Sequence, residues 1–178
     1  VVDNVETIIS VYNAVVKGIP SMERVVTVTG DGVVNPGNYK VLFGTNQNEL
    51  IEAAGGLKEG CEKVISGGPM MGFAMYTTDT PVTKTSSSIL CMSKDEVSAC
   101  EPTACINCGR CVDACPSRII PSRLADFSER HDEEAFLKFN GLECVECGSC
   151  SYVCPAKRQL KQAIGSMRKT ALANKKKK

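Results

Sequence analysis

Apolar residues recur at three- and four-residue intervals near the start of the chain. Side chains at such intervals lie on one face of an α-helix. Asp3 or Asn4 is suited to cap the start of this helix, and Gly18 followed by Pro20 is suited to end it. We therefore predict a helix over residues 5–19 that packs its apolar face on a core. The apolar positions are Val5, Ile8, Ile9, Tyr12, Val15, Val16 and Ile19.

The next stretch carries strand-like segments separated by turns. Apolar and β-branched residues gather there in short runs bounded by Gly, Pro and Asn, which is the pattern of strands joined by tight turns. The predicted strands are RVVTVT (24–29), YKVLF (39–43), KVISGG (63–68) and, as one or two strands, PVTK with SSSILCM (81–92).

One short helix interrupts these strands. In TNQNELIEAAGG (45–56), Thr45 or Asn46 is suited to cap the start, and Gly55 to close the end. A helix that covers a small sheet indicates an α+β module. The positions predicted to face the sheet are Leu50, Ile51 and Ala54.

The β-rich pattern stops at residues 93–104, SKDEVSACEPTA, and only loops and helices are predicted after them. One helix begins at Pro121, because proline suits the first helical turn. It runs towards Asn140, with a break near His131 and Asp132. A final helix follows Pro155, and its charged positions form a solvated face ending in a disordered KKKK. The inner positions of that helix are Leu160, Ala163, Ile164 and Met167.

Length and composition fit a chain with one large or two modest domains. It has 178 residues, of which 43% are hydrophobic, enough for a core. No apolar stretch approaches the ~18 residues of a membrane-spanning helix, and no signal peptide is visible. The sequence opens at Val1, within a segment that reads as ordered, so we expect an N-terminal part to be missing.

The net charge of +1 is unevenly distributed. Residues 155–178 carry nine Lys or Arg and no acid, so the rest of the chain holds twelve bases against twenty acids, a net charge of −8. An acidic body with a basic end indicates a docking or anchoring tail. Nucleic acid is not an expected partner, since no aromatic residues are interleaved with the lysines.

Eight of the eleven cysteines form two copies of the motif C-x2-C-x2-C-x3-C-P. The copies are CINCGRCVDACP (105–116) and CVECGSCSYVCP (144–155). Three thiolates at this spacing surround a 4Fe–4S cluster, and in two-cluster ferredoxins the fourth cysteine binds the other cluster. The predicted ligand sets are Cys105, Cys108, Cys111 with Cys154, and Cys144, Cys147, Cys150 with Cys115.

Zinc is the main alternative for these thiols. Structural zinc sites favour two ligand pairs, often with histidine. Each run here instead has three evenly spaced cysteines and a fourth further on, and His131 is the only histidine. Disulfides fit less well still, because cysteines at such close spacing are awkward partners. We expect His131 to lie on the surface, and Cys61, Cys91 and Cys100 to act as small buried hydrophobic residues.

Three further stretches resemble known protein families. Residues 26–56 resemble an SLBB (soluble-ligand-binding β-grasp) domain, and ISGGPMMG (65–72) resembles the glycine-rich turn that follows it. VDNVET (2–7) is similar to a stretch near the flavin in the flavin-carrying subunit of respiratory complex I. Together with a twin-cluster ferredoxin domain, this order resembles the RnfC family of the Rnf electron-transport complexes.

That resemblance implies an α+β chain, with a small SLBB domain followed by a helical two-cluster ferredoxin-like domain. The implied segments are the end of an FMN- and NADH-binding domain (1–22), the SLBB domain (23–93), the ferredoxin-like domain (94–171) and a basic tail (172–178). Asn4 and Thr7 fall where the family contacts FMN, although a plain helix cap explains them equally well. The SLBB domain then acts as a spacer and docking surface.

The implied function is electron transfer between NADH and ferredoxin through FMN and two 4Fe–4S clusters, coupled to ion movement. The chain would work with the other Rnf subunits on the cytoplasmic face of the membrane, in peripheral contact through its basic end. Two alternatives stay open: a cobalamin reductase of a microcompartment, which has similar modules, and a ligand-binding SLBB module whose metal only holds the fold.

Overall fold

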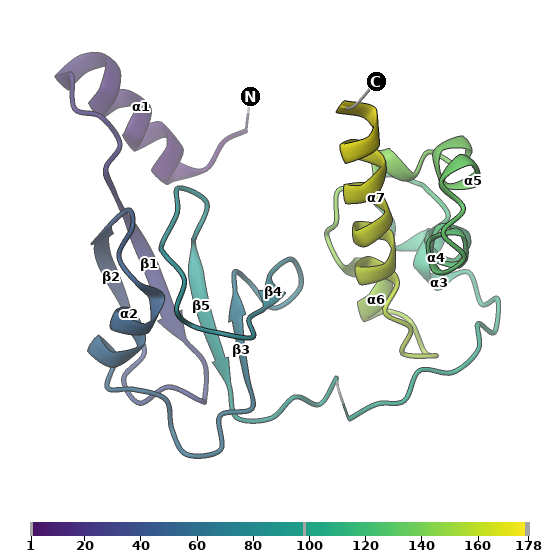
Figure 1. Ribbon diagram of the computed structural model, residues 1–178, viewed down its shortest axis with the longest axis horizontal. Coiled ribbons are helices and arrows are strands. Elements are labelled where there is room, and N and C mark those ends of the chain that lie inside the picture. The colour runs from purple at the N-terminus through teal and green to yellow at the C-terminus, as the bar shows by residue number, and fades with distance from the viewer. Residues whose placement is uncertain (1, 98, 177–178) are drawn as a thin grey trace. The chain divides into compact units, whose positions relative to one another are not determined.

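The computed structural model describes residues 2–97 and 99–176, which form two compact units divided between Asp95 and Glu96. The first unit is a mixed sheet with two helices, and the second is helical (Figure 1). This arrangement confirms the α+β class predicted from the alternating and helical patterns.

The first unit is built around a five-stranded sheet in the order β2-β1-β5-β3-β4. β1 and β5 are parallel, and the other neighbouring pairs are antiparallel. Its elements are α1 (Val5–Lys17), β1 (Glu23–Thr29), β2 (Gly37–Leu42), α2 (Gln47–Ala53), β3 (Lys63–Ser66), β4 (Phe73–Ala74) and β5 (Ser88–Met92).

Alternation along the central strands builds the core of this unit. Val26 and Val28 of β1 and Ile89 of β5 are buried on one face of the sheet, since every second side chain of a strand points the same way. α2 and the Ala54 that caps its end cover that face with Leu50, Ile51 and Ala54, the three positions predicted from the sequence. The Asn46 side chain caps α2 by accepting a hydrogen bond from the Asn48 backbone N–H at 2.9 Å.

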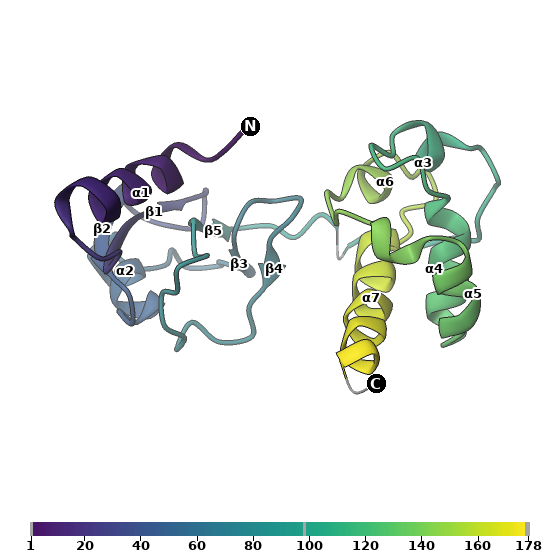
Figure 2. The ribbon, with the colours of Figure 1, turned by 90° about the horizontal axis from the view of Figure 1, so that it is seen from above.

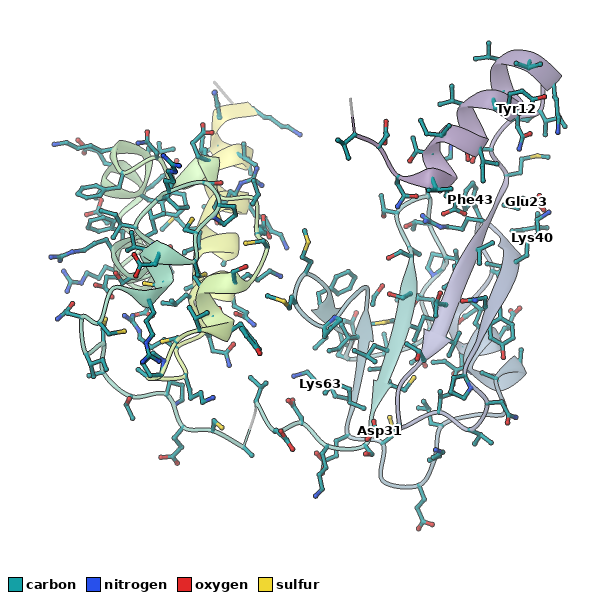
Figure 3. All side chains as sticks on the ribbon, turned by 180° about the vertical axis from the view of Figure 1, so that it is seen from behind. Tyr12, Glu23, Asp31, Lys40, Phe43 and Lys63 are labelled. Carbon is teal, nitrogen blue, oxygen red and sulfur yellow. The ribbon has the colours of Figure 1, made fainter. Side chains whose placement is uncertain are left out.

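Of the one or two strands predicted over 81–92, the structure has one, β5. PVTK lies outside it, and Pro81 makes only an isolated bridge with Asn46. The Thr83 hydroxyl bonds instead to Thr85 and Ser86. β4 was not predicted, since two residues are too few to show a strand period. On the opposite edge of the sheet, Glu23 and Lys40 of adjacent strands pair at 2.6 Å (Figure 3).

The first helix has the predicted caps but not the predicted packing. Asn4 accepts a hydrogen bond from the Glu6 backbone N–H, and Gly18 ends the helix at φ 65°. None of its residues is buried, however, and Tyr12 lies exposed on it (Figure 3). The apolar spacing identified an amphipathic helix correctly, but within the described residues nothing covers its apolar face, so the predicted core contact is wrong.

The second unit contains α3 (Arg110–Asp113), α4 (Pro121–Glu129), α5 (Glu133–Lys138), the 3-10 helix η1 (Gly141–Glu143), α6 (Ser149–Tyr152) and α7 (Leu160–Lys176). α4, α5 and α7 pack together around Phe136, Leu124, Leu160 and Ile164 (Figures 1 and 2). The predicted helix start at Pro121 and the break near His131 are confirmed.

The end of the chain differs from expectation in one respect. α7 continues through Lys175 and Lys176, which were predicted as disordered, while residues 177–178 lie outside the described part. Of the inner positions predicted for α7, Leu160, Ile164 and Met167 are buried. Among the described residues, no helix combines the length and the apolar character needed to cross a membrane.

Candidate metal centres

The two cysteine runs adopt the same local backbone. In each, an extended loop reaches a glycine in the left-handed conformation, Gly109 at φ 79° and Gly148 at φ 84°, and a one-turn helix follows. Asn107 and Glu146, which occupy the same place in each motif, also share positive φ values of 56° and 55°. The repeat in the sequence is therefore a repeat in structure, with matching loops that curl in the same way.

The structure brings the eight motif thiols together in two groups, each drawn from both runs. One hollow of about 120 Å³ is lined by Cys105, Cys108 and Cys111 of the first run together with Cys154 of the second. The other, of about 20 Å³, is lined by Cys144, Cys147 and Cys150 together with Cys115. The fourth cysteine of each run follows the one-turn helix α3 or α6 and so lies beyond its own loop.

The side chains around the thiols are mainly apolar. Ile106, Ala156 and Leu160 line the first hollow, and Ile119 and Ile164 line the second. Four thiols form the donor set that suits an iron–sulfur cluster, because thiolate sulfur binds its iron and the surrounding side chains tune its properties. The residues present therefore fit two such clusters.

The second hollow is the tighter of the two. Its volume is about that of one water-sized sphere. Within residues 2–97 and 99–176, no three Cys, His, Asp or Glu side chains are grouped closely enough to hold a single metal ion. None of the eleven cysteines, all of which are described, forms a disulfide.

Burial raises the pKa of two thiols in the second run. It raises the pKa of Cys150 to about 11 and also raises the pKa of Cys144. The Ser149 hydroxyl and backbone N–H, in contrast, lower the pKa of Cys147. Because the thiolate is the form that binds metal, loading this site requires protons to leave buried sulfur.

An ion pair supports the second loop from behind. Arg168 of α7 contacts Glu146 at 3.2 Å, and its Nε donates to the Leu142 carbonyl at 3.2 Å. Sequence reasoning missed this pair, because nothing in the pattern joins residues so far apart. Comparing the two runs does single out Glu146 as a charged residue, since the first run has the neutral Asn107 at the same place.

The remaining candidate residues have simpler surroundings. Asn4 caps α1 and Thr7 lies exposed in its first turn. Cys91 is buried as predicted and Cys61 is half-buried, but Cys100 is exposed, so that prediction is wrong for Cys100. His131 is exposed, as expected.

Comparison with known proteins identifies two domains. Residues 25–74 match the family model of the SLBB domain, and residues 104–158 match that of the 4Fe–4S dicluster domain. The second match covers both cysteine runs, so the helical unit is a domain for two 4Fe–4S clusters, in agreement with the prediction from the motif.

Curated relatives extend this similarity to almost the whole chain. It is 47% identical over 92% of its length to the RnfC protein of the proton-translocating ferredoxin:NAD(+) oxidoreductase complex of Clostridium ljungdahlii. It is 40% identical over 99% of its length to the RnfC protein of the Na(+)-translocating ferredoxin:NAD(+) oxidoreductase complex of Acetobacterium woodii. A third relative, from the ion-translocating oxidoreductase complex of Yersinia enterocolitica, is 40% identical over 74% of the chain.

The chain spans 36% and 40% of the lengths of the first two relatives. Over that span it has the SLBB domain, the dicluster domain and the identity expected of a homologue. It therefore belongs to the RnfC family of the ion-translocating ferredoxin:NAD oxidoreductase (Rnf) complexes, the family that its sequence resembles.

Proposed function

We propose that this chain relays single electrons within an ion-translocating ferredoxin:NAD oxidoreductase complex. The observation that carries the proposal is the exchange of thiols between two hollows, each lined by three cysteines of one run and the fourth of the other. Sharing of ligands in this way keeps two redox centres close to each other, which electron transfer between them requires. The names of the relatives supply the reaction class.

Two sets of cysteines are proposed to hold the clusters. When bound, each 4Fe–4S cluster supplies a centre that gains and loses one electron. Ile119 and Ile164 would pack against the cluster in the second hollow, and Arg168 holds the loop there through Glu146. The proposed sets are Cys105, Cys108, Cys111 with Cys154, and Cys144, Cys147, Cys150 with Cys115.

The proposed organisation follows the family order. Residues 1–22 would end an FMN- and NADH-binding domain, 23–93 form the SLBB domain, 94–171 form the ferredoxin-like domain, and 172–178 form a basic tail. We propose that Asn4 and Thr7 contact FMN. Their exposed position at the start of the 13-residue helix α1 supports this, because free backbone N–H groups at helix N-termini favour phosphate.

The proposed partners are the other subunits of such a complex, with NADH and ferredoxin reached through the whole assembly. We further propose a peripheral position on the cytoplasmic side of the cell membrane. Lys169, Lys175 and Lys176 lie exposed along α7, and exposed basic residues near a helix end favour anionic lipid headgroups.

Anaerobic reconstitution of the chain with iron and sulfide tests the relay. We expect about eight iron and eight sulfide per chain, and a paramagnetic signal from both centres on one-electron reduction of each. The control variants Cys61→Ser and Cys100→Ser leave the motif intact and should keep full iron content. A colourless protein, or one that takes up zinc in place of iron with no redox signal, would overturn the proposal.

A further inference from the structure

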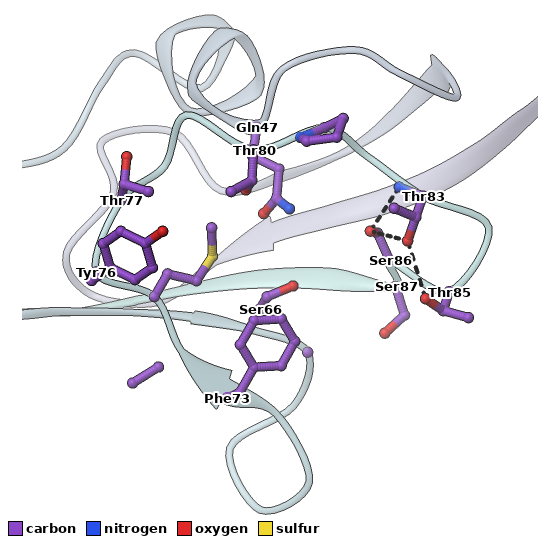
Figure 4. Close-up of a pocket in the computed structure, with 14 residues that line it drawn as sticks. Gln47, Ser66, Phe73, Tyr76, Thr77, Thr80, Thr83, Thr85, Ser86 and Ser87 are labelled. Atoms are coloured by element: carbon purple, nitrogen blue, oxygen red, sulfur yellow. Dashed lines mark hydrogen bonds between the residues drawn. The ribbon is translucent and has the colours of Figure 1, made fainter. Parts of the chain in front are cut away.

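A second kind of pocket lies wholly within the first unit. Its volume is about 490 Å³, and its walls come from β3, β4, the start of α2 and the segment over residues 75–87 (Figure 4). Pockets of roughly 300–1,000 Å³ hold small organic ligands in proteins. Nothing in the proposed electron relay uses this pocket, since none of its lining residues belongs to the cysteine runs.

A buried amide points into this pocket without a partner. Gln47, the first residue of α2, is only 5% exposed, and its Oε1 has no hydrogen-bond partner. Figure 4 shows its side chain extending from the helix into the space between Thr80 and Ser66. The Thr80 hydroxyl is also buried without a partner. Unpaired buried polar atoms are rare because each loses its hydrogen bonds to water.

The hydroxyls of Thr83, Thr85 and Ser86 do not donate to Gln47 Oε1. Thr83 Oγ1 lies 3.1 Å from Thr85 Oγ1 and 3.2 Å from Ser86 Oγ, so these three groups bond to one another (Figure 4). The backbone N–H of Thr83 also donates to Ser86 Oγ at 3.0 Å. The unpaired acceptor at Gln47 is therefore left for a group that enters the pocket with a donor of its own.

The other residues that line the pocket indicate the charge and polarity of the molecule that would bind there. None of the described residues lining the pocket is charged, so an ion would lose its hydration without compensation. Phe73 and Tyr76 stand at the pocket with exposed rings, at 66% and 100% exposure, and Met75 lies between them in the sequence. Exposed aromatic rings beside a pocket favour a flat apolar body that covers them.

We propose that this pocket binds an uncharged, ring-sized molecule that carries an amide-type N–H. The N–H donates to Gln47 Oε1, while the ring packs against Phe73 and Met75. The binding site belongs to the first unit alone and is independent of the clusters. A carboxylate of the same size is excluded because the lining offers it no positive charge.

Three probes of equal size test this. Benzamide carries the ring and the N–H donor, acetophenone keeps the ring and the carbonyl but lacks the donor, and benzoate carries a charge. Each is titrated into the ¹⁵N-labelled 178-residue chain, and the amide shifts of the residues lining the pocket are followed by NMR. We expect roughly millimolar binding of benzamide, binding of acetophenone weaker by about tenfold, and no binding of benzoate.

Two variants assign the effect to particular side chains. Gln47→Met keeps the length of the side chain and removes its amide, so benzamide should lose its preference over acetophenone. Phe73→Ala, at an exposed position where misfolding is not a concern, should weaken both neutral probes equally and preserve their ratio. Glu49→Gln, exposed on the same helix outside the pocket, is the matched control and should change neither.

Several results would overturn the proposal. These are equal binding of benzamide and acetophenone, binding of benzoate, an unchanged preference in Gln47→Met, or no shifts with any probe, which would mean that only water fills the pocket. Binding of the peptide mimic N-acetylalanine methylamide without binding of benzamide would identify a seat for a protein segment and would also overturn it. If Gln47→Met fails to fold, the probe series and Phe73→Ala still decide the question.

Discussion

Arg168 on α7 and Glu146 in the second cysteine loop form an ion pair at 3.2 Å, which joins the last helix to the residue just before Cys147. The equivalent place in the first loop is taken by Asn107, with the same left-handed backbone and no charge. The two halves of the duplication therefore share their geometry but differ in the electrostatics close to the thiols.

Removing the arginine should loosen the second loop selectively. Arg168→Met loses the ion pair and the hydrogen bond to the Leu142 carbonyl, a loss of about 1 kcal/mol because both side chains are partly exposed. We expect iron to leave the second site several-fold faster when a chelator is added, as followed by the loss of visible absorbance. Arg123→Met, an exposed arginine on α4, should not change the rate. Equal acceleration in both variants would contradict this role.

Removing the charge of Glu146 should change the redox potential of one centre only. Glu146→Gln deletes a negative charge next to Cys147 and leaves Arg168 in place, which favours the reduced, more negative state of a nearby cluster. With an effective dielectric constant near 20, we expect an increase of roughly tens of millivolts in that potential. A redox titration followed by EPR measures it. Asn107→Gln in the first loop is the neutral control, and equal shifts of both centres would refute the prediction.

The exchange of ligands can be tested by counting iron in double variants. If Cys115 binds with the second run, Cys115→Ala with Cys147→Ala disables one cluster and leaves about four iron atoms per chain. Cys115→Ala with Cys108→Ala disables both and leaves almost none. The opposite result, with more iron retained by the Cys108 double variant, would place Cys115 with its own run.

A glycine next to the core of the second unit should tolerate no side chain. A Cβ at Gly141 would come within 2.3 Å of the Phe136 ring, which is fully buried. Gly141→Ala therefore forces the ring or η1 to shift, at an expected cost of about 1–3 kcal/mol of unfolding free energy. Thermal unfolding followed by circular dichroism measures this. Gly68→Ala, where a Cβ meets nothing within 4 Å, should change the stability far less.

The first unit should owe part of its stability at neutral pH to Asp31. The hydroxyl and backbone N–H of Ser93 donate to this carboxylate and lower its pKa from 3.8. A lowered pKa contributes stability that is complete above pH 3.8 and is lost as the pH falls through the folded-state value. Asp31→Asn should be less stable than the parent at pH 7, and the difference should shrink below about pH 4.

Acid unfolding curves of the first unit, read from the far-ultraviolet signal, check this dependence. Glu59→Gln, exposed in the same unit, is the control and should unfold like the parent throughout. A stability difference for Asp31→Asn that stays constant from pH 7 down to pH 3 would show that the carboxylate charge is not involved.

Local signals in the sequence predicted the elements that local chemistry determines. The cap at Asn46, the proline start at Pro121 and the buried face of α2 all follow from side chains a few residues apart, so the pattern contains them. The cysteine motif could also be predicted from local sequence, because its spacing reflects the shape of one loop.

Features that depend on distant residues could not be predicted in this way. The ion pair of Arg168 with Glu146 and the unpaired amide of Gln47 arise only when separate segments fold together. β4 is set by pairing with β3 rather than by its own two residues. The helical spacing of α1 revealed an apolar face but carried no information about what covers it.

Because the apolar face of α1 is exposed, this helix should unfold before the rest of the first unit. α1 buries none of its side chains, and it is tied to the sheet through Glu6, which accepts from Arg24 at 2.7 Å and from the Val25 backbone N–H at 2.9 Å. Segments with so few packed neighbours unfold locally at little cost. Amide protons of α1 should therefore exchange with deuterated solvent, and a protease should cut there, long before the strands behind it separate.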